Sequence, residues 1–122
     1  MLDYTVGITT EETHNQLTIH LTFQEKNSPL EFLNCSFVIF YENQLLINDF
    51  LAFTDNIQNN RTCYIKIAQC LSYMKFSHYD NLFIVKIENS NQKSLVRLPF
   101  KNNIKKVFQH IEEIIKKKIE QL

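Results

Sequence analysis

The residues that could bind a metal ion are few and widely spaced. Cys63, Cys70 and His78 are separated by seven and eight positions, and Cys35 could supply a fourth ligand. Strong zinc signals depend on closely paired ligands such as Cys-x-x-Cys, and this chain has no such pair. We therefore predict isolated core thiols, with no metal site and no cofactor.

The residues that could act as catalysts are equally weak candidates. The run Ser77 to Asp80 contains the letters of a hydrolytic triad, but triad members meet in space and rarely follow one another in sequence. Glu112 and Glu113 would point about 100° apart on a helix, which does not suit an acid/base pair. Gly7 is the only glycine, which excludes a glycine-rich phosphate loop. We predict that the protein is not an enzyme.

The composition is that of a soluble globular protein. Its 122 residues suffice for a single domain, spanning 1–122, with a core of its own. Three cysteines form no disulfide framework, and the first residues do not begin a signal peptide, so we expect a cytoplasmic or nuclear protein that is not secreted. No apolar run approaches the roughly 18 residues that a membrane span requires.

The net charge is zero, but the two halves of the chain differ in sign. Residues 1–60 contain eight acidic residues and one basic residue, for a net charge of −7. Residues 61–122 contain twelve basic and five acidic residues, for a net charge of +7. The halves either neutralise one another when packed, which we favour, or form a polarised surface whose basic face attracts an acidic partner.

Hydrophobic periodicity predicts strands followed by one long helix. Residues 17–24 alternate strictly between apolar and polar, which is typical of a half-buried strand. Residues 102–122 place their apolar side chains on one stripe, which predicts an amphipathic helix. Residues 62–76 fit either a strand or a helix, and their β-branched and aromatic content favours a strand, broken near Gln69. The other expected strands are 4–9, 32–41, 45–53 and a final hairpin at 80–100 with a polar turn at 89–92. We expect a two-residue hairpin loop at 42–43 and a loop at 54–61.

The expected fold is α+β and mainly β, with about seven antiparallel strands between residues 3 and 100. They would form a partly open barrel or sandwich, capped by the helix at 102–122. This order, carried by the stretch YIKIAQCLSYMKFSHYDNLFIVKIENSNQKSLVRLPFKNNIKKVFQHIEEII, resembles a pleckstrin-homology-like domain, including its GRAM relatives. The resemblance implies that the helix closes the open barrel end, where Val107 or Phe108 replaces the family's usual Trp.

The same resemblance suggests a binding module. Lipid-binding members carry a basic pattern in the first two strands, whereas GITTEETHNQLTIHLTF offers two glutamates and no basic residue, which argues against a lipid headgroup. We expect a protein or acidic peptide as partner, bound beside a sheet edge or at the closing helix. Nucleic acid is not expected, and a homodimer is a further option. The basic residues proposed for the site are Lys66, Lys75, Arg97, Lys101, Lys105 and Lys106.

Two alternatives stay open at this point. The lysines around the start of the last helix are either an acidic-peptide site or ordinary surface residues. The whole protein is alternatively an immunity or antitoxin-type inhibitor, which would block a basic enzyme cleft with an acidic face from the first sixty residues.

Overall fold

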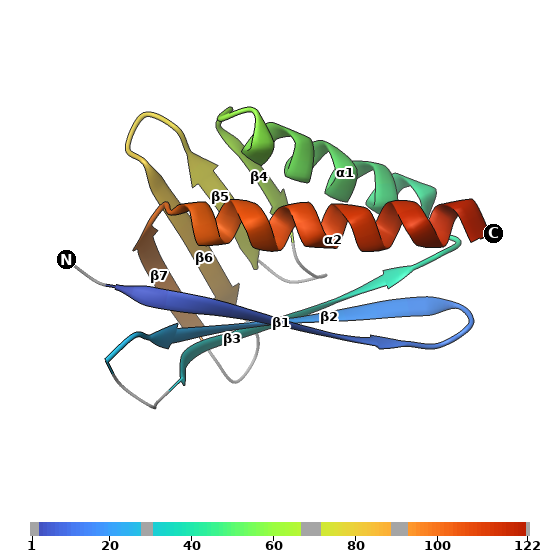
Figure 1. The fold of residues 1–122 in the computed structure, drawn as a ribbon, viewed down its shortest axis with the longest axis horizontal. Coiled ribbons are helices and arrows are strands. Elements are labelled where there is room, and N and C mark those ends of the chain that lie inside the picture. The colour runs from blue at the N-terminus through green and yellow to red at the C-terminus, as the bar shows by residue number, and fades with distance from the viewer. Residues whose placement is uncertain (1–2, 28–30, 67–71, 89–92, 122) are drawn as a thin grey trace.

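The computed structural model describes residues 3–27, 31–66, 72–88 and 93–121. Seven antiparallel strands form two sheets, and two helices pack with them (Figure 1). The elements in chain order are β1 Tyr4–Glu12, β2 Gln16–Glu25, β3 Glu31–Phe40, α1 Gln44–Gln58, β4 Cys63–Lys66, β5 Tyr73–Ser77, β6 Leu82–Glu88, β7 Lys93–Pro99 and α2 Asn102–Gln121.

The first sheet has the order β1-β2-β3 and follows the predicted alternation. In β2, every second side chain is buried, from Leu17 to Phe23, and the residues between them face outward. Because successive side chains of a strand point to opposite faces, this pattern turns one face of the sheet toward the core. The strand predicted at 4–9 continues to Glu12, so the connection to β2 is shorter than the sequence suggested.

The largest error of the sequence analysis concerns residues 42–61. The residues expected as a hairpin loop at 42–43 instead precede α1, the expected strand at 45–53 lies within α1, and much of the expected loop at 54–61 belongs to the same helix. Asn43 is the N-cap, and its side-chain oxygen accepts a hydrogen bond from the Leu46 amide at 3.1 Å. The buried residues then recur at helical spacing, which explains why this segment is a helix: Ile47, Phe50, Phe53, Thr54 and Ile57.

The second sheet has the order β4-β5-β6-β7. The stretch at 62–76, predicted as a single interrupted strand, contributes both β4 and the first residues of β5. The expected break near Gln69 and the turn at 89–92 lie outside the described residues. The predicted final hairpin is confirmed, because β6 and β7 pair from Leu82 opposite Pro99 to Glu88 opposite Lys93.

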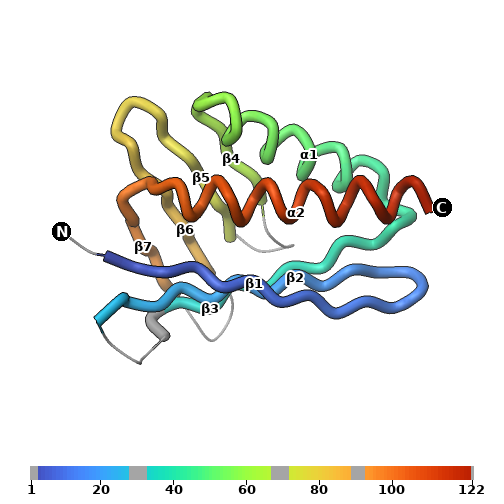
Figure 2. The backbone as a smooth tube through the Cα atoms, viewed as in Figure 1, coloured from blue at the N-terminus to red at the C-terminus, as the bar shows by residue number. Residues whose placement is uncertain are grey.

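The predicted α+β class, the seven antiparallel strands and the long C-terminal helix are confirmed. The strands form separate sheets of three and four strands that do not close on one another. Helix α2 runs beside α1, with the three-stranded sheet along its other side (Figures 1 and 2). Its Phe108 ring lies 5.4 Å from that of Phe53 in α1 and 5.7 Å from that of Phe83 in β6. The helix therefore joins the two sheets through one core and plugs no barrel end.

Candidate functional site

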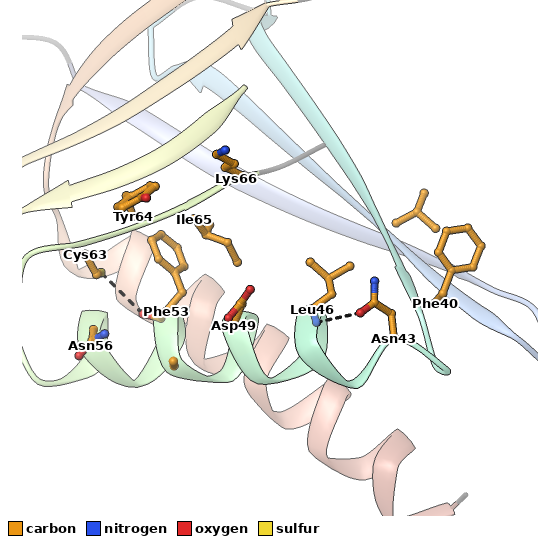
Figure 3. A pocket seen from close by; sticks show the side chains of 12 residues that line it. Phe40, Asn43, Leu46, Asp49, Phe53, Asn56, Cys63, Tyr64, Ile65 and Lys66 are labelled. Carbon is orange, nitrogen blue, oxygen red and sulfur yellow. Dashed lines mark hydrogen bonds between the residues drawn. The ribbon is translucent and has the colours of Figure 1, made fainter. Parts of the chain in front are cut away.

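A groove of about 690 Å³ lies between α1, the end of β3 and β4 (Figure 3). This volume falls within the range of small-ligand and peptide sites. Its lining residues are Val38 and Phe40 from β3, Asn43, Leu46, Asp49, Ala52, Phe53 and Asn56 from the start and body of α1, and Cys63, Tyr64, Ile65 and Lys66 from β4.

The groove runs along the edge of β4. All four residues of this strand line it, although Cys63 and Ile65 turn toward the core and Tyr64 and Lys66 turn outward. Side chains of both faces can border one cavity only where that cavity follows the side of the strand. Strand β4 is also the last strand of its sheet, so the backbone groups on this side have no strand partner among the described residues.

The opposite wall is one face of another outer strand. Val38 and Phe40 are two residues apart in β3, so they share a face, and Phe40 remains 50% exposed. Leu46 and the buried Phe53 add apolar surface from α1, as Figure 3 shows. The groove thus combines apolar side chains with a strand edge that pairs with no other strand among the described residues.

The polar side chains that line the groove are Asn43, Asp49, Asn56, Tyr64 and Lys66. Asp49 of α1 and Lys66 of β4 provide one charge of each sign, and both side chains are exposed. The Cys63 thiol donates a weak hydrogen bond to the Phe53 carbonyl oxygen at 3.8 Å. Burial raises the pKa of this thiol to about 11, so it stays protonated at neutral pH and is a poor nucleophile.

The structure divides the six predicted basic residues into two groups. Lys66, Lys75 and Arg97 lie on the outer face of the four-stranded sheet. The other three, Lys101, Lys105 and Lys106, lie at the start of α2 and do not line the groove. Lys101 forms an ion pair with Asp3, and hydrogen bonding to its ammonium lowers the pKa of that carboxyl.

Charges from the two halves of the chain meet in several places. Besides the pair of Asp3 with Lys101, Glu12 of β1 contacts Lys118 of α2, and Asp55 lies 3.8 Å from Arg61. These contacts tie acidic residues of the first half to basic residues of the second. They reduce the acidic surface that the inhibitor alternative requires.

One cluster resembles a catalytic triad in its residue types. His20 Nδ1 lies 2.7 Å from Ser36 Oγ, and His20 Nε2 lies 3.6 Å from Glu11 Oε2. The three residues sit on the outer face of the three-stranded sheet, apart from the groove. Acyl transfer also needs oxyanion donors and a concave site for substrate, which this arrangement does not supply.

The remaining candidates of the sequence are the possible metal ligands and the run from Ser77 to Asp80. Within the described residues, no group of three or more His, Cys, Asp or Glu side chains could hold a metal ion. Ser77 Oγ instead donates to Asp80 Oδ2 at 3.2 Å, which stabilises the turn between β5 and β6. Cys70 lies outside the described residues.

Comparison of the chain with protein-family models, with curated proteins and with solved structures finds no match. Neither helix, over its described residues, combines the length and the apolar character needed to cross a membrane. The groove therefore has to be interpreted from its own geometry.

Most of the groove was not predicted from the sequence. Of the lining residues, only Lys66 was predicted to bind a partner and only Cys63 was considered as a metal ligand, because a strand was predicted where α1 forms one wall. The available signal was Asn43 as a helix N-cap, followed by apolar residues at helical spacing.

Proposed function

We propose that the protein is a non-enzymatic peptide-binding module that accepts an extended segment of a partner protein as an additional strand beside β4. The observation that supports this is the lining of the groove by every residue of a terminal strand. Unpaired strand edges are recurrent sites of peptide addition, because their amide and carbonyl groups supply hydrogen bonds to any sequence.

Successive side chains of the bound segment would point to opposite faces of the sheet. A strand added at the usual spacing of about 4.8 Å would alternate between the two faces of β4. Its inward side chains would pack near Ile65, Leu46 and Phe53, and its outward side chains would lie beside Tyr64 and Lys66. The groove selects for apolar residues at the inward positions in this arrangement.

The short length of β4 limits the affinity. Four residues offer few backbone hydrogen bonds, and each contributes about 0.5–1.5 kcal/mol net. We therefore expect a weak, reversible interaction with a Kd on the order of micromolar.

The kinship to pleckstrin-homology-like domains also remains our proposal, supported by the seven strands and the long helix that follows them. We likewise propose a cytoplasmic or nuclear location, since Cys35 and Cys63 are free thiols, which is usual in a reducing compartment.

The test is selection of peptides from a displayed library, followed by titration against two variants of α1. Ala52→Trp places a large side chain in the groove, whereas Leu45→Trp changes a residue that is 78% exposed and outside the groove. We expect Ala52→Trp to abolish binding and Leu45→Trp to preserve it.

Hydrogen exchange of the β4 amides gives an independent readout, because backbone pairing should slow exchange on the free edge when peptide binds. Equal binding by both variants, or unchanged exchange in β4, would contradict the proposal. Light scattering tests whether the chain forms dimers as its concentration rises. Dimers that Ala52→Trp disrupts would instead identify the added strand as a second copy of the chain.

A further inference from the structure

Two rows of side chains on the outer face of the four-stranded sheet begin at β4. The first row consists of residues that pair in register on neighbouring strands, in the order Tyr64, Lys75, Ile84 and Arg97. The second row is formed in the same way by Lys66, Tyr73, Lys86 and Leu95. Each row begins at β4 and therefore at the groove.

The cations on this face differ in how strongly they are engaged. Lys86 lies 3.1 Å from Glu88 and 5.9 Å from the centre of the Tyr73 ring. Lys66, Lys75 and Arg97 are exposed and form no ion pair with any residue that the structure describes. The face next to the groove thus presents positive charge that is available to a partner.

We propose that the segment bound at β4 alternates acidic and apolar residues, with the acidic side chains outward. This inference rests on the proposed strand addition. A residue of the added strand that pairs with Lys66 lies in the second row, where opposite charges directly across a ladder attract. A residue that pairs with Tyr64 lies in the first row, diagonal to Lys66 and on the same row as Lys75.

Distance decides which cation contributes most. Lys66 would be one strand away from the added segment, whereas Lys75 would be two strands away, at about 9.6 Å. That separation is comparable to the Debye length of about 8 Å at physiological ionic strength. Lys66 therefore determines the preference for an acidic residue, and Lys75 adds a weaker, salt-dependent attraction, while Arg97 is four strands away, at about 19 Å, and is largely screened.

Asp49 works in the same direction from inside the groove. Its exposed carboxylate on α1 repels acidic side chains that would point inward, toward Leu46 and Phe53. Asp49 and Lys66 together determine which face of the bound segment is acidic and which is apolar. The expected core is a four-residue pattern of acidic, apolar, acidic and apolar residues.

The experiment uses three short fluorescent peptides with identical apolar residues at the inward positions. Their outward positions carry Glu, Ser or Lys, and binding is measured by fluorescence anisotropy at low and physiological salt. We expect the Glu peptide to bind roughly two- to fivefold more tightly than the Ser peptide, and the Lys peptide to bind most weakly. Lys66→Glu should reverse this order.

Lys106→Glu is the matched control, because it makes the same charge change at an exposed position of α2. It should leave the order of the three peptides unchanged. A reversal by Lys106→Glu as strong as that by Lys66→Glu would overturn the inference, since the preference would then follow net charge.

Two further outcomes separate this inference from the strand addition itself. Equal binding of all three peptides, abolished by Ala52→Trp, would refute the acidic preference and leave the groove as a peptide site. No binding of any peptide would refute both. Tight binding of a fluorescent oligothymidylate, lost in Lys66→Glu and Arg97→Glu, would also overturn the inference by assigning the face to single-stranded nucleic acid.

Discussion

Tyr4 shows how one side chain connects the two ends of the chain. It is buried in the core, and its hydroxyl donates a hydrogen bond to the Pro99 carbonyl oxygen at 2.6 Å. Burial raises the pKa of Tyr4, so the hydroxyl remains a donor throughout the neutral range. The sequence placed Tyr4 correctly on the first strand, but alternation alone cannot identify a partner 95 positions away.

Tyr4→Phe should lower the free energy of unfolding by about 1 kcal/mol, because it removes this bond and leaves the carbonyl oxygen without its donor. Urea denaturation measures the change. Tyr79→Phe is the control, since Tyr79 is 91% exposed, and it should alter the midpoint little. Equal effects of the two substitutions would contradict the importance of the buried bond.

Helix α1 is the element whose misassignment hid the groove. Its sequence, from Gln44 to Gln58, contains apolar residues close enough together to satisfy a strand period over a short window. The decisive feature is Asn43, which was interpreted as a turn residue and is instead the N-cap. Strand β2 and helix α2 were predictable because their apolar residues keep one period throughout. The groove depends on how α1 packs beside β4, which no local pattern specifies.

Asn43→Ala should therefore destabilise the protein by about 1 kcal/mol, since the Leu46 amide loses its side-chain acceptor. Chemical denaturation followed by circular dichroism provides the measurement. Asn43→Ser retains a capping oxygen and should recover most of the stability. Loss of similar size in both variants would show that Asn43 acts through something other than the cap.

At the scale of the whole molecule, the two sheets depend on the helices for their connection. The three-stranded and four-stranded sheets do not close on one another, yet their inner faces share one core with both helices. The sequence indicated that the stripe of α2 must be covered, and this is confirmed by the burial of Ile104, Phe108, Ile111 and Ile115. The predicted arrangement was a partly open barrel or sandwich, and the structure has two sheets that do not close into a barrel.

Phe108 is the side chain where these layers meet, so it offers the sharpest test of the arrangement. It is 1% exposed, and its ring contacts Phe53 of α1 and Phe83 of β6, while Phe83 contacts Phe23 of β2. Phe108→Ala should cost about 3–5 kcal/mol, because it leaves a cavity between both sheets and α1. Phe108→Leu keeps most of the volume and should cost less than half as much.

Thermal unfolding monitored separately by far-UV and near-UV circular dichroism distinguishes loss of packing from loss of secondary structure. Because Phe108 packs on Phe83 of β6, which in turn packs on Phe23 of β2, we expect both signals to change at one lowered midpoint in the Leu variant. A near-UV transition at a lower temperature than the far-UV transition would instead mean that packing is lost while secondary structure remains, and that Phe108 does not couple the two.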